Sequence, residues 1–155
     1  MVICIDLDGT LVSMDRAYTD LSTPMTLMPG ALEALGALKR AGHVLVLYSA
    51  RANRSLWENP QLDPLVRAGV RRVDMEQWEE RRELHKARYD EMLRFVDEQL
   101  PGVFDAVDDG AQGKPNADLF IDDRAIRFSS LGGAEALSWR DIADRYGALA
   151  TGTTG

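Results

Sequence analysis

Residues 2–10 read Val2-Ile3-Cys4-Ile5-Asp6-Leu7-Asp8-Gly9-Thr10, an apolar run that changes at once into an acidic turn. The first four residues are apolar and mostly β-branched, which is typical of a buried strand. Asp-Gly is a turn-forming pair, so we expect the strand to end just before it. Asp6 and Asp8 alternate with Leu7 and therefore fall on the same side of an extended chain. The stretch predicts a buried strand with two carboxylates at its carboxyl end.

Strand and helix patterns alternate along the rest of the chain. Pro29-Gly30 opens a helical leucine pattern that stops at Gly42, and an apolar run at 43–48 predicts a second buried strand. Further expected segments are an interrupted helix over 51–68, a strand at 70–73, a helix over 78–100, strands at 103–107 and 119–121, and a last helix at 139–146. This order favours an α/β fold with an open, mainly parallel sheet and right-handed crossovers.

Length and composition indicate a globular protein. The chain has 155 residues, 45% of them hydrophobic and 28% charged, which fits one domain over 1–150 followed by a small-residue tail at 151–155 that we expect to be disordered. The longest apolar runs have five residues, far short of a membrane-spanning helix. Because no signal-like segment precedes the acidic turn and the single cysteine requires no oxidising compartment, we expect a cytoplasmic protein.

The charge balance disfavours nucleic acid as a partner. There are 18 basic and 25 acidic residues, a net charge of −7, and such a field repels polyanions. A phosphorylated small molecule stays compatible with it, because a metal ion and a few local cations can reverse the sign inside one cleft. The sequence leaves the oligomeric state open.

Polar residues follow the predicted strands, and parallel strands bring their carboxyl ends to one edge of the sheet. These residues are Asp6, Asp8, Ser49, Asp122 and Asp123, with Lys114 just before the last strand. Two carboxylates about 4 Å apart repel by about 4 kcal/mol at an effective dielectric constant near 20. A divalent cation relieves that repulsion, and a ligand set made only of oxygens selects Mg²⁺ over zinc. We therefore expect a Mg²⁺ site formed by the four aspartates.

In this order, these residues resemble the four motifs of the haloacid dehalogenase (HAD) superfamily, specifically its aspartate-nucleophile phosphatases. The matched positions run from 6 to 123, about three quarters of the chain. The resemblance implies a Rossmann-like parallel sheet with helices on both faces. It also implies that Asp6 is the nucleophile, Asp8 the general acid and base, Ser49 and Lys114 the phosphate-binding residues, and Asp122 a Mg²⁺ ligand with Asp123 beside it.

These assignments predict a Mg²⁺-dependent phosphomonoester hydrolase. Asp6 attacks phosphorus to give an aspartyl phosphate, while Asp8 protonates the leaving alcohol and then activates water. Without metal, four carboxylates and Lys114 carry a charge of about −3, which would exclude a phosphate dianion and predicts absolute metal dependence. A non-catalytic metal- or phosphate-binding module and a phosphotransferase stay open as alternatives.

The spacing leaves no room for a cap domain. Forty residues separate Asp8 from Ser49 and 64 separate Ser49 from Lys114, and the expected elements occupy both intervals. We therefore predict an open site that takes a small phosphomonoester, covered by residues 12–28 or by a neighbouring subunit. A protein or a nucleic-acid end is the alternative substrate for such an open site.

Several other residues stay open at this point. Asp108-Asp109 also follows a strand-like run, but Asp109-Gly110 is typical of a turn, so we favour the later pair, Asp122-Asp123. Arg51 and Arg54 either face the cleft or belong to a solvated helix face, and the same holds for Arg16 and Tyr18 in the loop after the first strand. The charged segment 79–88 is predicted to be a solvent-exposed helix laced with ion pairs.

Overall fold

A computed structural model of the chain describes residues 1–125, 127, 136–138 and 141. Its contacts divide the chain into two units, Met1–Asp123 and Arg124–Gly155. In the second unit, the Leu137 N–H donates to the carbonyl of Arg127 at 2.8 Å. The expected helix at 139–146 and the tail at 151–155 lie outside the described residues, apart from position 141. A single domain over 1–150 stays a prediction.

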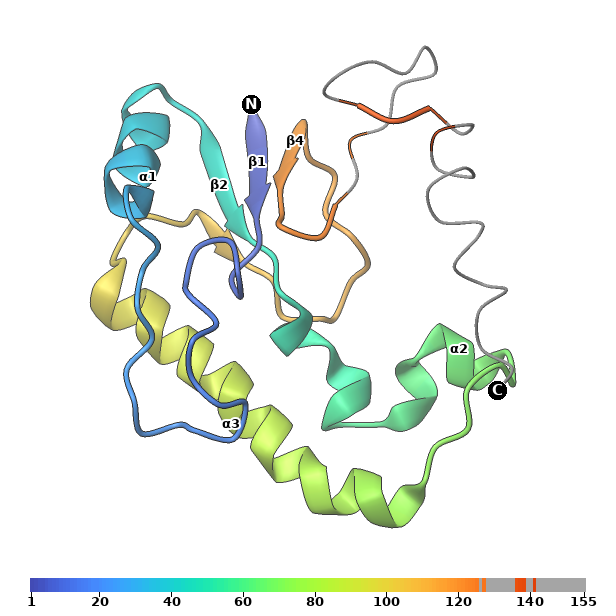
Figure 1. Cartoon of the computed structure of the whole chain (residues 1–155). Coiled ribbons are helices and arrows are strands. Elements are labelled where there is room, and N and C mark those ends of the chain that lie inside the picture. Colours follow the sequence, from blue (N-terminus) through green and yellow to red (C-terminus); the bar gives the residue numbers. More distant parts are fainter. Residues whose placement is uncertain (126, 128–135, 139–140, 142–155) are drawn as a thin grey trace. The chain divides into compact units, whose positions relative to one another are not determined.

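The first unit is built on a parallel sheet. Its strands are β1 (Val2–Ile5), β2 (Val44–Leu47), β3 (Ala106–Val107) and β4 (Leu119–Ile121). They lie in the order β3-β2-β1-β4, and all three pairings are parallel (Figure 1). The registers place Leu45 and Leu119 on either side of Ile3, so β1 is central. The predicted α/β class with a mainly parallel sheet is confirmed.

The helices follow the strands as the sequence predicts, with differences at the ends. The longer ones are α1 (Ala31–Arg40) and α3 (Met75–Gln99). Helix α3 begins three residues before the expected start because the side chain of Asp74 accepts a hydrogen bond from the N–H of Gln77 at 3.1 Å. Between β2 and α3 the chain forms short turns of 3₁₀-helix and one short α-helix; these are Ala50–Ala52, Arg54–Leu56, Pro60–Leu62 and α2 (Pro64–Arg67).

The strand expected at 70–73 is absent, and this prediction was wrong. The N–H groups of Val70 and Arg71 both donate to the carbonyl of Leu65, at 2.9 and 3.0 Å, and so close the end of α2. Val70 is 75% exposed. A short segment with β-branched residues forms a strand only where a neighbouring strand can take its backbone hydrogen bonds, and here two of its N–H groups bond to the preceding helix instead.

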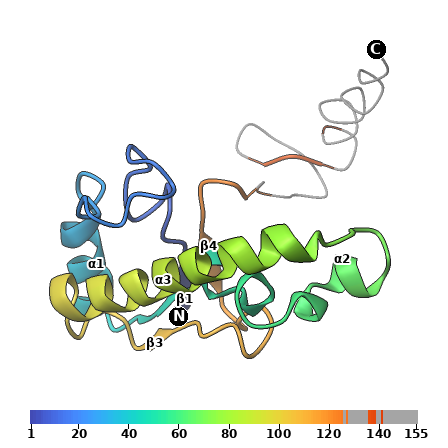
Figure 2. The ribbon, with the colours of Figure 1, turned by 90° about the horizontal axis from the view of Figure 1, so that it is seen from below.

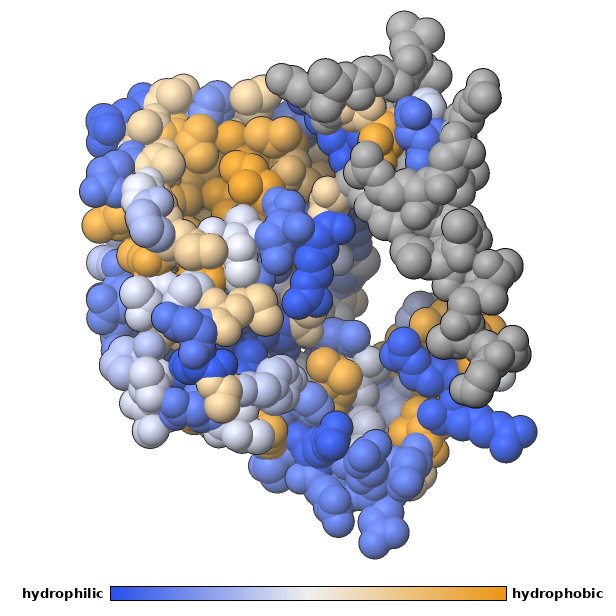
Figure 3. All heavy atoms as spheres, in the orientation of Figure 1, coloured by the Kyte–Doolittle hydropathy of each residue, from blue (hydrophilic) through white to orange (hydrophobic). Residues whose placement is uncertain are grey.

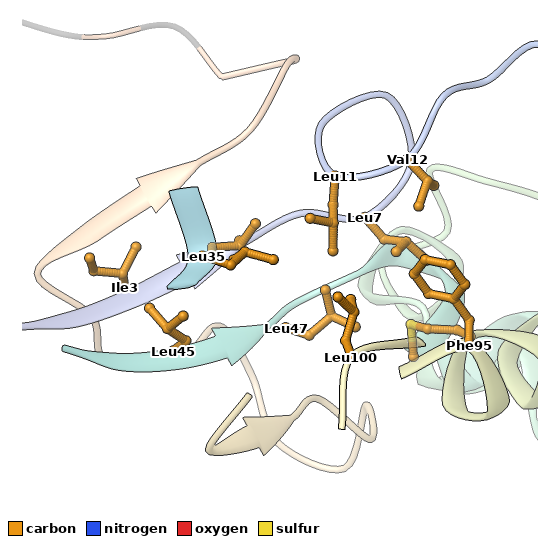
Figure 4. Packing of buried hydrophobic residues seen from close by; sticks show 11 residues of the cluster. Ile3, Leu7, Leu11, Val12, Leu35, Leu45, Leu47, Phe95 and Leu100 are labelled. Carbon is orange, nitrogen blue, oxygen red and sulfur yellow. The ribbon is translucent and has the colours of Figure 1, made fainter. Parts of the chain in front are cut away.

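Both long helices pack on one face of the sheet. The crossovers through α1 and α3 step across the sheet in the same direction, and right-handed connections then place both on the same side. Buried side chains from both helices accordingly join a single core with the inward side chains of the strands (Figure 4). That core includes Ile3, Ile5, Leu45 and Leu47 from the strands, Leu35 from α1, and Met92 and Phe95 from α3.

The connection from β3 back to β4 runs the other way across the sheet. Residues 108–118 contain no helix, and the ammonium of Lys114 lies 4.0 Å from the ring of Phe120. Phe120 pairs with Cys4, whose neighbours Ile3 and Ile5 face the helices, so it points to the opposite side of the sheet. In the described part of the chain, helices therefore cover one face, and a helix on the second face stays a prediction.

The N-terminal half of α3 extends past the sheet and packs against the segment 50–74 (Figure 2). The indole N–H of Trp78 donates to the carbonyl of Ser55 at 2.8 Å, and the ring of Trp57 stacks on Tyr89 at 5.5 Å. In the space-filling view, hydrophilic side chains gather over this part of the molecule and hydrophobic ones over β1, β2 and α1 (Figure 3). Among the described residues, no helix has both the length and the apolar character to span a bilayer.

Candidate metal centre

Three carboxylates from two neighbouring strands meet at the carboxyl edge of the sheet. Asp6 directly follows β1, and Asp122 and Asp123 directly follow β4; one carboxylate oxygen of each lies within 4.8 Å of the others. The N–H of Asp6 donates to the carbonyl of Ile121 at 3.0 Å, which continues the β1–β4 pairing to the start of the cluster. Parallel pairing thus brings together residues that are 116 positions apart in the sequence.

Gly9 and Thr10 fit this cluster closely. Gly9 has a φ of +83°, and a Cβ atom at this position would lie 2.6 Å from Oδ2 of Asp123. The hydroxyl of Thr10 accepts a hydrogen bond from the N–H of Asp123 at 3.0 Å and donates to Oδ2 of Asp6 at 3.4 Å. Glycine is therefore required both by the backbone and by the approach of Asp123, while Thr10 links the two acidic segments.

The cluster has the chemistry of a site for a hard cation. Burial raises the pKa of Asp6 to about 6, and the charges of Asp122 and Asp123 add to the increase, against a hydrogen bond from the backbone of Leu7. The pKa is raised because ionised Asp6 is both desolvated and repelled by its neighbours. A divalent cation would reverse that repulsion, and three carboxylates without nitrogen or sulfur donors match Mg²⁺. The residues present therefore fit the metal that the sequence predicts.

Asp8 lies in a different environment, although it is only two residues from Asp6. Its carboxylate accepts two hydrogen bonds from Arg51, one from Nε and one from Nη2, both at 2.7 Å. Burial on its own would raise the pKa of Asp8, but the hydrogen bonds and the charge of Arg51 outweigh it and hold that pKa below its ordinary value. Of the four aspartates predicted to bind metal, three lie together and Asp8 binds Arg51.

Arg51 connects Asp8 to a buried charge network. Its Nη1 donates to Oε2 of Glu91 at 2.8 Å, and Arg16 binds the same oxygen at 2.6 Å. Arg88 lies 3.9 Å from the Asp8 carboxylate and donates to the carbonyl of Tyr18 at 2.7 Å. Three guanidinium groups and two carboxylates thus give the network a net positive charge beside the negative cluster.

The two predicted phosphate-binding residues make other contacts. Ser49 is buried, and its hydroxyl accepts a hydrogen bond from the N–H of Arg51 at 3.2 Å, which caps the 3₁₀ turn that follows. Lys114 lies over the ring of Phe120, as described above. Their role in phosphate binding stays a prediction. The competing pair Asp108-Asp109 forms a turn, since both carboxylates accept hydrogen bonds from backbone N–H groups two residues on.

Sequence reasoning missed the charge network. The segment 79–88 was expected to be solvent-exposed, but Arg88 is buried and His85 bonds to the hydroxyl of Tyr18 at 2.8 Å. Arg51 is also buried, so a solvated helix face does not describe it, whereas Arg54 pairs with Glu58 at the surface. One signal was available: Arg88 and Glu91 share a helical face with Met92 and Phe95, because positions three, four and seven apart lie on one side of a helix.

No protein family and no curated protein matches the chain. Similar solved structures include a conserved protein from Bacteroides thetaiotaomicron, with 21% identity, a TM-score of 0.38, and coverage of 100% of this chain and 98% of that one. They also include the D,D-heptose 1.7-bisphosphate phosphatase from B. bronchiseptica complexed with magnesium and phosphate, with 22% identity, a TM-score of 0.36, and coverage of 94% and 63%.

Proposed function

We propose that the protein is a Mg²⁺-dependent phosphomonoester hydrolase in which Asp6 is the nucleophile. The observation that supports this function is the meeting of Asp6, Asp122 and Asp123 at the carboxyl edge of a parallel sheet, with ligand oxygens within 4.8 Å of one another. In open α/β sheets, this edge is where ligands bind. Bound there by the three carboxylates, Mg²⁺ would offset the charge that otherwise repels a phosphate dianion.

The reaction consists of two displacements at phosphorus. A carboxylate oxygen of Asp6 forms a bond to phosphorus while the bond to the alcohol oxygen breaks, and Asp8 gives its proton to that oxygen. Asp8 then takes a proton from water, whose oxygen attacks the aspartyl phosphate. The bond between Asp6 and phosphorus breaks, inorganic phosphate leaves, and both aspartates return to their initial states.

The ion pair with Arg51 affects the two displacements differently. Arg51 favours the anionic form of Asp8, which is the form that activates water in the second displacement. The first displacement needs the protonated form, which the ion pair opposes. Esters with a good leaving group depend less on this proton, so we expect them to be hydrolysed faster than alkyl esters.

A small phosphorylated substrate is favoured over a macromolecule. Arg16 and Tyr18, within the segment 12–28, are bound to Glu91 and Arg88 of α3, so this segment is held close to Asp8. We propose that it restricts access to the site. The net charge of −7 also disfavours nucleic acid.

A second candidate function is a module that binds metal or phosphate without turnover. The specific observation in its favour is the two-point ion pair of Asp8 with Arg51, because a carboxylate held in this way is a poor proton donor. In such a module the acidic cluster would still bind Mg²⁺, but no proton would reach a leaving group.

Hydrolysis of 4-nitrophenyl phosphate distinguishes the two functions. The rate is measured with Mg²⁺ and with EDTA for the wild type, Asp6→Asn, Asp8→Asn and Asp97→Asn, an exposed residue of α3 that serves as the control. An enzyme hydrolyses the ester only with Mg²⁺, loses activity in the first two variants and keeps it in the control. Equal rates in all samples, together with Mg²⁺ binding by calorimetry, would favour the binding module. Phosphate found on an added alcohol would indicate a phosphotransferase.

A further inference from the structure

Arg51 is held along two edges of its guanidinium group. One edge, formed by Nε and Nη2, donates to the two carboxylate oxygens of Asp8. The remaining nitrogen, Nη1, donates to Oε2 of Glu91 at 2.8 Å and to the carbonyl of Arg88 at 3.0 Å. A planar group bound on both edges cannot rotate without breaking hydrogen bonds on each side. The orientation of Arg51 toward Asp8 is therefore set from α3.

Glu91 supplies the only charged acceptor for Arg51 on the α3 side among the described contacts. It is 8% exposed, and its Oε2 atom binds both Arg51 and Arg16. Two guanidinium groups brought together in a buried region repel one another, and the carboxylate between them offsets that repulsion. The chain positions Glu91 through the neighbouring Met92, which is fully buried in the core.

We propose that Glu91 is a positioning residue for the hydrolysis, acting through Arg51 on Asp8. The inference rests on the proposed function, because it assigns Glu91 to the proton transfer at Asp8. With Glu91 in place, Arg51 donates from Nε and Nη2 to Asp8 in one fixed orientation. Without that charge, the carbonyl of Arg88 still accepts a hydrogen bond from Nη1 of Arg51, but nothing offsets the repulsion between Arg51 and Arg16, so Arg51 and the Asp8 carboxylate are held less firmly in this orientation.

Glu91 also binds Arg16 of the segment 12–28, which offers a second role for the same side chain. Glu91 would then act by holding this segment rather than by orienting Arg51. The two roles separate in a background that lacks Arg16, where only the bond to Arg51 remains.

The primary test compares two esters that differ in their need for a proton. The variant Glu91→Gln keeps the shape of the side chain and removes its charge, and Glu98→Gln makes the same change at an exposed position of α3. We expect Glu91→Gln to lower kcat by about tenfold with glycerol 2-phosphate, because the loss of a fixed orientation of Asp8 outweighs the weaker opposition to its protonated form; this size is typical of residues that orient a functional group. With 4-nitrophenyl phosphate we expect a smaller decrease, because its leaving group needs little protonation. The control should match the wild type with both esters.

A merely structural role would lower kcat by the same factor with both esters, and that result would overturn the proposal. The second comparison uses Arg16→Met with and without Glu91→Gln. We expect the same ester-dependent loss in this background, since Arg51 is still present. Loss of the Glu91 effect in the absence of Arg16 would show that Glu91 acts through the segment 12–28, which would also overturn it.

Folding is monitored for each variant by thermal unfolding. If Glu91→Gln does not fold, Glu91→Asp replaces it, because this variant keeps the charge and withdraws it from Arg51 by one methylene. If the wild type hydrolyses neither ester with Mg²⁺, the proposed hydrolase function itself is rejected. Wild-type hydrolysis with no ester-dependent change at Glu91 would reject the positioning role alone.

Discussion

Asp6 and Asp8 both follow strand β1 and lie two residues apart, yet their surroundings shift their pKa values in opposite directions. The pKa of Asp6 is raised to about 6 by burial and by the carboxylates of Asp122 and Asp123. Burial acts on Asp8 as well, but Arg51 outweighs it and lowers the pKa of Asp8. The sequence spacing predicts the same side for both side chains, but the neighbouring elements give the two carboxylates opposite electrostatic environments.

The difference in pKa separates the roles of two regions. The acidic region is the cluster of Asp6, Asp122 and Asp123, and the basic region is the charge network of Asp8, Glu91, Arg16, Arg51 and Arg88. The acidic region repels its own charges and therefore favours a cation. In the basic region the two carboxylates already have cationic partners within the protein, because Arg51 joins Asp8 to Glu91.

The largest effect is expected at the acidic region. Replacing Asp6 by Asn removes the attacking oxygen and one metal ligand, so Mg²⁺-dependent hydrolysis should fall by more than about a thousandfold. The measurement is steady-state release of inorganic phosphate, with Asp97→Asn as the matched control. A variant that retains wild-type activity would remove Asp6 from the reaction.

Replacing Arg51 by Met tests the basic region. Two buried or partly buried carboxylates, Asp8 and Glu91, lose their shared partner, and we expect the free energy of unfolding to fall by about 3–5 kcal/mol at neutral pH. The pKa of Asp8, measured by NMR, should rise because burial then acts with less opposition.

The matched control is Arg71→Met, which removes the ion pair with Asp63 from an arginine side chain that is 60% exposed. An exposed pair contributes about 0–1 kcal/mol. Equal losses of stability in the two variants, measured by urea unfolding, would contradict the distinction between the two regions.

The third effect concerns the fit of the turn to the acidic region. In Gly9→Ala the residue keeps an unfavourable φ of +83° and its Cβ atom meets Asp123, so we expect a loss of about 1–3 kcal/mol in the free energy of unfolding and weaker Mg²⁺ binding. Gly113→Ala is the control, because nothing lies within 4 Å of its Cβ position. Mg²⁺ binding by calorimetry that is unchanged in Gly9→Ala would show that Asp123 need not approach the turn.

Much of this arrangement could be predicted from the sequence. The apolar run before Asp6 predicts β1, and the run before Asp122 predicts β4, because apolar β-branched and aromatic residues are typical of strands. Their parallel pairing then brings the carboxylates together. The network around Asp8 could not be derived in this way, since Arg51, Arg16 and Glu91 come from three segments whose contacts depend on tertiary packing.

The smallest effect is a pH dependence of stability. In the metal-free protein, Asp6 has a pKa of about 6, above its value in the unfolded chain, so its contribution to stability is complete below about pH 4 and is lost as the pH rises through 6. Asp8 has a lowered pKa, so its contribution is present above about pH 4 and is lost as the pH falls through its folded-state value.

Urea unfolding in EDTA, from pH 4 to 7, checks this prediction. The stability of the wild type should fall relative to that of Asp6→Asn as the pH rises, and Mg²⁺ should reduce the fall because it binds the ionised form. A constant difference between the two proteins over this range would contradict the raised pKa of Asp6.

If the carboxylates that follow β1 and β4 bind one divalent cation, a crystal structure with Mn²⁺ in place of Mg²⁺ should locate that ion between them. We expect an anomalous-scattering peak at coordination distance, close to the 2.0–2.1 Å typical of Mg²⁺, from an oxygen of Asp6 and from an oxygen of Asp122 or Asp123. A Mn²⁺ ion bound elsewhere without Asp6, or no peak at this edge of the sheet in a Mn²⁺-soaked crystal, would contradict it.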